Sequence, residues 1–97
     1  MPTSETRVPT ASGERYMTQL CKHWSHRFEV TLEPGRGRVS FGPDRACRFE
    51  ASAEELRIRL EAADPDALAR LEVVVLDHLH RFAFREDLGA VEWARSG

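Results

Sequence analysis

The chain has 97 residues, of which 41% are hydrophobic and 31% are charged, and its formal net charge is −2. These values match ordinary globular domains and exclude wholesale disorder. No apolar run approaches the roughly 18 residues of a membrane span, and the amino terminus lacks the apolar stretch of a signal peptide. A slightly acidic balance argues against a nucleic-acid binder. We therefore expect one small cytoplasmic domain whose partners include neither nucleic acid nor membrane.

The amino-terminal third predicts an arm followed by a helix. Residues 1–11 are rich in Thr, Ser and Pro and are expected to be flexible, although Arg7-Val8 could add a short edge strand. Ser12 is the expected N-cap of a helix of about 13 residues, with Glu14 in its first turn, where the helix dipole favours an acid. Apolar residues recur at helical spacing and define the buried face of this helix: Tyr16, Met17, Leu20 and Trp24.

From residue 27 the apolar residues recur with a period of two, which is typical of half-buried strands. Gly- and Pro-containing turns at residues 34–37 and 42–44 separate the first three strands. A short link at residues 52–54 precedes the fourth, which has the clearest alternation. The strands are predicted from their apolar positions: Phe28, Val30 and Leu32; Val39 and Phe41; Cys47, Phe49 and Ala51; Leu56, Ile58 and Leu60.

A second helix is predicted to begin at Asp64-Pro65, with Asp as N-cap and Pro at the first helical position. It should run for about 17 residues, to near Phe82. Its core stripe consists of Leu68, Leu71, Val75, Leu79 and Phe82. Residues 84–89 form a connection, and Val91 and Trp93 suggest a closing strand.

This order predicts an α+β fold with the sequence α-β-β-β-β-α-β, forming a single domain over residues 12–95. An antiparallel meander of four to five strands with both helices packed on one face satisfies every apolar stripe.

Two motifs carry a family resemblance. The first combines Arg15-Tyr16, Gln19-Leu20-Cys21 and His23, and the second is the run His78–Glu86. Together with the glycine turn between them, they resemble the bacterial domain-of-unknown-function 2218 family over roughly residues 6–93. The resemblance implies no established activity. It implies a link to iron or siderophore handling, because members sometimes lie beside, or are fused to, siderophore-interacting flavin reductases.

The histidines suggest a metal site. Cys21 and His23 point in nearly opposite directions on a helix, whereas His23 and His26 are neighbours on one face. His78, at the border of the second helix's core stripe, is the best third ligand if the helices pack side by side. Such a set would bind a metal ion or haem, although no cofactor is evident from a complete ligand motif. The alternative is that His23 and His78 are boundary residues that hydrogen-bond to a carbonyl or to Gln19.

Arginines suggest two further sites. Arg15 and Arg85 would form an anion clamp near His78, or else Arg85 caps the second helix and pins the connection after it. The solvent side of the sheet is expected to carry cross-strand ion pairs, with binding of a carboxylate-rich ligand as the alternative. The expected members of that face are Arg27, Arg38, Arg48, Arg57 and Arg59 beside Glu29, Glu50 and Glu61.

A second apolar stripe on the second helix lies nearly opposite its core stripe and consists of Ala69, Val73, Leu76 and His80. It packs within the chain or forms an interface with a partner protein or a second copy. No nucleophile–base pair or phosphate loop is predicted, so we name no catalytic residue. The hypothesis is a small non-enzymatic binding or interaction module, with a metal- or haem-binding protein that uses the histidines as the alternative.

Overall fold

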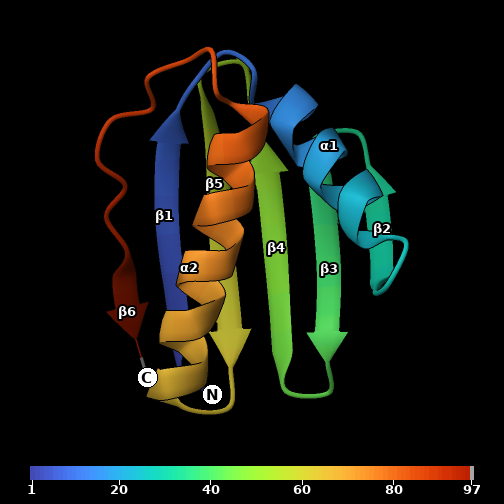
Figure 1. Cartoon of the computed structure of the whole chain (residues 1–97), viewed down its shortest axis with the longest axis vertical. Helices are drawn as coiled ribbons and strands as arrows, with labels where there is room; N and C mark the ends of the chain where they lie inside the picture. The colour runs from blue at the N-terminus through green and yellow to red at the C-terminus, as the bar shows by residue number, and fades with distance from the viewer. Residues whose placement is uncertain (97) are drawn as a thin grey trace.

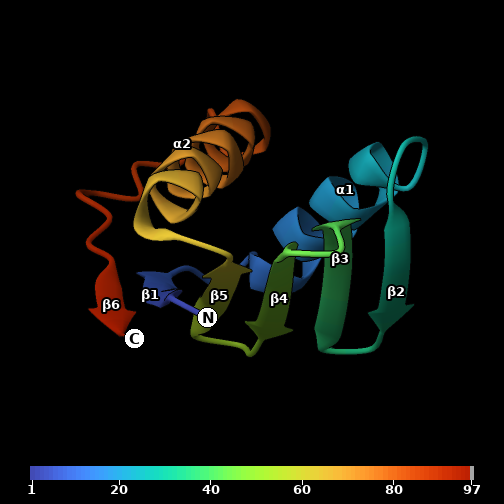
Figure 2. The ribbon, with the colours of Figure 1, turned by 90° about the horizontal axis from the view of Figure 1, so that it is seen from below.

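The computed structural model describes residues 1–96 and shows a six-stranded antiparallel sheet with two helices, α1 (Gly13–Trp24) and α2 (Pro65–Phe82) (Figure 1). Figure 2 shows both helices over one face of the sheet and no helix over the other face. The predicted α+β class and the one-sided helices are confirmed, with six strands in place of four to five. In sheet order they are β2 (Glu29–Glu33), β3 (Arg36–Gly42), β4 (Arg45–Ala51), β5 (Glu55–Ala62), β1 (Thr3–Pro9) and β6 (Ala94–Ser96).

Strand β1 corrects the expectation of a flexible arm over residues 1–11. Thr3–Pro9 pairs along its whole length with β5, and its first residues pair with β6. The inward-facing residues are Ser4, Thr6 and Val8, all of them buried. Two of these three are polar, so the apolar alternation that marks the other strands is missing. The short edge strand expected at Arg7-Val8 is therefore longer than predicted and lies inside the sheet.

The closing strand is also displaced from its expected place. Val91 and Trp93 lie in the connection after α2, where they are half-buried against the core, and the strand itself is formed by Ala94–Ser96. Its central residue, Arg95, donates two hydrogen bonds to the carboxylate of Glu72 on α2, at 2.7 and 3.0 Å. This strand is therefore held to α2 by a polar contact and shows no alternation of apolar residues.

The helix starts differ in how well they follow the prediction. At α2, Asp64 Oδ1 accepts a hydrogen bond from the Ala67 amide at 2.8 Å, and Pro65 is the first helical residue, as predicted. At α1, the Ser12 side chain makes no capping hydrogen bond, and its amide instead donates to Thr10 Oγ1 at 3.0 Å. Neither helix within residues 1–96 is both long and apolar enough to cross a membrane.

The helices and the sheet enclose one hydrophobic core. The predicted faces of both helices are buried, apart from Phe82, which is half-buried. Helix α1 approaches the sheet closely at Gly37, where a Cβ atom would lie 2.8 Å from Cys21 Sγ. At the β2–β3 turn, Gly35 has a φ of +77°, and its amide donates to the Glu14 carboxylate at 3.1 Å. This contact ties the first turn of α1 to the end of the sheet.

Candidate functional site between the two helices

Six aromatic rings form a continuous series where α1, α2 and β3 meet. Successive ring centroids are separated by 6.1, 5.2, 5.2, 5.1 and 4.9 Å. Offset and edge-to-face contacts at such distances stabilise aromatic pairs beyond the area that they bury. In order, the series consists of Phe82, His23, His78, Trp24, Phe41 and Phe28.

The structure brings the imidazoles of His23 and His78 together, with their centroids 5.2 Å apart and their planes at 45°. His78 Nδ1 lies 2.7 Å from the Val74 carbonyl oxygen. Because a carbonyl only accepts hydrogen bonds, Nδ1 carries the hydrogen, and Nε2 of the neutral ring is an acceptor. This arrangement agrees with the expectation of a boundary histidine bonded to a carbonyl, and it leaves Nε2 as the ring nitrogen able to coordinate a metal ion.

His26 does not join this pair. His26 lies beyond Trp24, the last residue of α1, and its ring does not contact the ring of His23 or of His78 among the aromatic contacts of residues 1–96. Residues 1–96 contain no group of three or more His, Cys, Asp or Glu side chains that could hold a metal ion. The expected set of His23, His26 and His78 is therefore corrected to a pair of histidines.

A cleft of about 210 Å³ opens beside the Phe28 end of the ring series. Its charged lining residues are Arg45, at the start of β4, and Arg70, on α2, and both are exposed. Arg45 has a loose ion pair, with 3.9 Å between its Nε and Asp44 Oδ1. The remaining walls are apolar and consist of Trp24, Phe28, Phe41, Leu71 and Val74. Apolar walls with a few convergent polar groups are the usual composition of a small-molecule site.

The two arginines of the expected anion clamp lie beside other rings. The Arg15 guanidinium is over the ring of Tyr16, at 5.4 Å from its centroid, and that of Arg85 is over the ring of Phe84, at 5.3 Å. Both arginines are exposed. The structure thus gives each of them an adjacent aromatic partner, and the anion clamp near His78 stays a prediction.

The expected interface on α2 divides into covered and exposed positions. Ala69 and Leu76 are half-buried, and Leu76 packs against the core. Val73 is 68% exposed, and His80 is also exposed. Glu72, four residues before Leu76 on the same side of the helix, binds Arg95 of β6. The carboxy-terminal segment therefore reaches this side of α2 and leaves Val73 open.

Neither cysteine supplies a reactive thiolate. Burial raises the pKa of the Cys21 thiol to about 11 and that of Cys47 well above its ordinary value. Both thiols stay protonated near neutral pH, and a protonated thiol is a poor nucleophile.

A family model described as "Uncharacterized protein conserved in bacteria (DUF2218)" matches residues 5–94. The chain belongs to this family. Among solved structures, the NMR structure of PA4090 from Pseudomonas aeruginosa is 40% identical in sequence, with a TM-score of 0.82 over 97% of this chain and 96% of that one. No curated protein matches the chain.

The two motifs of this DUF2218 chain meet in space. The Tyr16 hydroxyl donates to Glu86 Oε1 at 2.5 Å, and Thr10 Oγ1 donates to the same oxygen at 2.9 Å. The hydrogen bond to Glu86 raises the pKa of Tyr16. These bonds hold the start of α1 to the segment after α2, and the His23–His78 contact joins the last turn of α1 to α2. Much of what the motifs encode is therefore the docking of the two helices that border the cleft.

Sequence reasoning did not find the cleft arginines. Arg45 follows a turn and Arg70 occupies an exposed helical position, and neither belongs to a local pattern. The only available signal was the group of aromatic residues near the end of α1, where Trp24 and Phe28 are four residues apart.

Proposed function

We propose that this DUF2218 protein is a small non-enzymatic binding module that holds the apolar part of an organic anion in the cleft where α2 and the end of α1 meet β3 and β4. One observation carries the proposal: the cleft has apolar walls, two arginines and no carboxylate among its lining residues within the described chain. From the family resemblance, we place this binding in iron or siderophore handling in the bacterial cytoplasm.

The size of the cleft limits its ligand. Sites for drug-sized ligands enclose about 300–1,000 Å³, whereas this cleft encloses about 210 Å³. A single aromatic ring or a short aliphatic chain suits that space, with Trp24 and Phe41 offering their rings as walls. The acidic group of the ligand would remain at the mouth, where Arg45 and Arg70 can donate paired N–H groups to it.

Benzoate provides a direct test, with benzyl alcohol as its uncharged counterpart. We expect saturable shifts in ¹H–¹⁵N spectra around Trp24, Phe41 and Val74 with benzoate, and much weaker binding of the alcohol. Arg70→Gln should raise the dissociation constant for benzoate about three- to tenfold, the loss of one exposed charge-assisted contact of about 1 kcal/mol. Arg81→Gln is the matched control, because Arg81 is on the same helix but pairs with Asp77 at 3.1 Å.

Equal weakening of benzoate binding by Arg70→Gln and Arg81→Gln would show that the effect comes from the overall charge of the protein and not from a contact of Arg70. Equal binding of benzoate and the alcohol would remove the arginines from the proposal, and unchanged spectra with both compounds would refute a site for small organic anions at this cleft.

A second candidate function is metal binding by His23 and His78, favoured by the free acceptor Nε2 of His78 beside the other ring. Zinc and then ferrous iron should produce chelator-reversible shifts confined to these two residues and their neighbours. His78→Ala should abolish the shifts, while His80→Ala, an exposed histidine on the same helix, should preserve them. Spectra that do not respond to a several-fold excess of either ion would rule out a tight site for both.

A further inference from the structure

The helix-free face of the sheet carries three arginines at directly opposing positions of neighbouring strands. Arg38 on β3 is the register partner of Arg48 on β4, and Arg48 is the register partner of Arg59 on β5. Like charges placed directly opposite each other destabilise strand pairing. Because neighbouring strands lie about 4.8 Å apart, the Cα atoms of this arginine row span roughly 10 Å. An anion bound along the row would remove the repulsion.

Acidic residues of the same face neutralise little of the positive charge of the arginine row. Arg48 has one loose ion pair, with 3.9 Å between its Nε and Glu61 Oε1. Glu5 is the register partner of Arg59 but forms its ion pair with Arg57, at 2.9 Å. Within residues 1–96, neither Arg38 nor Arg59 has an ion pair closer than 4.0 Å.

In the next row of the sheet, by contrast, acidic and basic residues lie opposite each other from β2 to β5. Arg36 lies on β3 between its register partners Glu33 on β2 and Glu50 on β4. Arg57 is opposite Glu50 on β5 and approaches it to 3.9 Å. Positive and negative residues alternate along this row from β2 to β5, and Arg7 on β1, opposite Arg57, has its own ion pair with Glu55 at 3.8 Å. The three adjacent arginines of the arginine row have no such alternation.

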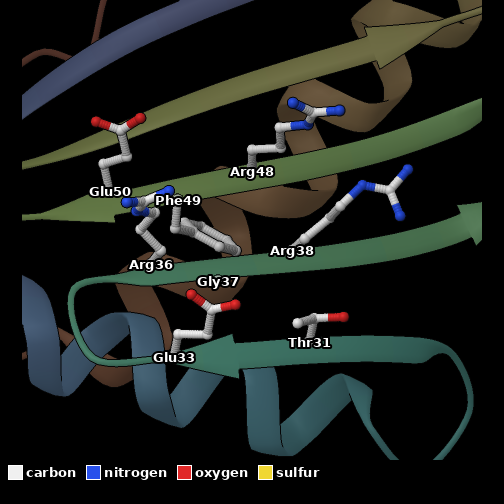
Figure 3. Close-up of a pocket in the computed structure, with 8 residues that line it drawn as sticks. All are labelled: Thr31, Glu33, Arg36, Gly37, Arg38, Arg48, Phe49 and Glu50. Atoms are coloured by element: carbon white, nitrogen blue, oxygen red, sulfur yellow. The ribbon is translucent and has the colours of Figure 1, made fainter.

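The surface is hollowed along the arginine row. Arg38 and Arg48 line an open pocket of about 360 Å³, and Arg48 and Arg59 line an adjoining one of about 100 Å³. Gly37 and Phe49 both face the helices, where Phe49 is 1% exposed, so at these two positions the helix-free face of the pocket consists of backbone. Figure 3 shows Arg38 and Arg48 extending side by side, away from the acidic side chains that share the pocket.

We propose that the arginine row binds a small multivalent oxyanion, with two or more carboxylate or phosphate groups. Guanidinium groups bind such oxygens through paired N–H donors, and adjacent guanidinium groups suit adjacent anionic groups. A long nucleic-acid strand fits this face poorly, because Glu29, Glu33, Glu50 and Glu61 surround the row and would repel it. The aromatic residues of the central strands pack toward the core and offer no stacking surface. This site is on the opposite face of the sheet from the cleft.

Citrate and pyrophosphate test whether the row binds a carboxylate or a phosphate anion, and acetate is the singly charged control. All titrations are made at constant ionic strength because salt screens exposed charges. We expect saturable amide shifts at Arg38, Arg48 and Arg59 with citrate, pyrophosphate or both. The stronger response identifies whether the row prefers carboxylate or phosphate groups. Arg48→Gln and, separately, Arg59→Gln should each weaken binding at least fivefold. Arg81→Gln removes an exposed arginine of α2, outside the sheet, and should leave the affinity unchanged.

Four results would overturn the proposal: shifts of equal size with acetate, shifts located away from β3 to β5, equal weakening by Arg81→Gln, or tighter binding of an oligothymidine than of either small anion. Folding does not confound the test, because replacing one arginine of the row relieves repulsion and should raise the melting temperature. Each variant must also lose the thermal stabilisation that citrate or pyrophosphate gives the unmodified protein.

Discussion

Replacing Phe49 with alanine should lower the free energy of unfolding by about 3–5 kcal/mol, the usual cost of deleting a fully buried phenylalanine ring. Phe49 is 1% exposed and lies on the central strand β4, under the helices. Its removal leaves a cavity between the two layers that well-packed neighbours can fill only in part. Because domains of this kind are stable by about 5–15 kcal/mol, the variant should unfold at a much lower urea concentration.

Phe84→Ala is the matched control, since the same ring is deleted at a position that is 73% exposed. Its effect on the free energy of unfolding should stay within about 0.5 kcal/mol. A comparable loss in the two variants would contradict the assignment of Phe49 to the core. A large loss for Phe84→Ala that grows with protein concentration would instead show that this ring is covered by a second copy of the chain.

The sequence predicts the elements that bury one continuous apolar face. Strands β2 to β5 show apolar residues at alternate positions, and α2 adds the Asp64-Pro65 start, so these elements appear at nearly their observed bounds. Strand β1 lacks this signal because Ser4 and Thr6 occupy two of its inward positions. Ser4 is buried there because it hydrogen-bonds to Glu72, 68 residues away, and local pattern carries no information about such a partner.

The candidate site was predictable only in part for a related reason. His23 and His78 each lie at the border of an apolar stripe, and two helices packed on one sheet bring such borders together. The third expected ligand, His26, lies beyond the end of α1, and residues 1–96 contain no three-ligand group around the pair. Arg45 and Arg70 meet at the cleft through the offset of α2 relative to β4, which depends on core packing. The α2 interface centred on Val73 stays a prediction.

Arg95→Met should produce the second large effect, because it leaves a buried carboxylate without its main partner. Glu72 is 7% exposed and accepts hydrogen bonds from Arg95 at 2.7 and 3.0 Å and from Ser4 Oγ at 2.6 Å. A buried hydrogen-bond acceptor that is left without its donor costs about 1–3 kcal/mol. The loss of the Arg95 hydrogen bonds to Glu72 should therefore lower the free energy of unfolding by about 2 kcal/mol at pH 7. Arg81→Met is the control, since its partner Asp77 is exposed and such helix pairs contribute about 0.3–0.5 kcal/mol.

Acid should erase the difference between Arg95→Met and the unmodified protein. The hydrogen bonds from Arg95, and secondarily the one from Ser4, hold the pKa of Glu72 below its ordinary value against the opposing effect of burial. The unfolded chain therefore binds the Glu72 proton at a higher pH than the folded chain does, and this contribution to stability is present above the ordinary glutamate pKa of about 4.3 and lost as the pH falls below it. Urea unfolding between pH 7 and pH 3 should show the two proteins converging at the acidic end. A difference that persists undiminished at pH 3 would mean that Arg95 stabilises β6 through its aliphatic stem rather than through the Glu72 charge.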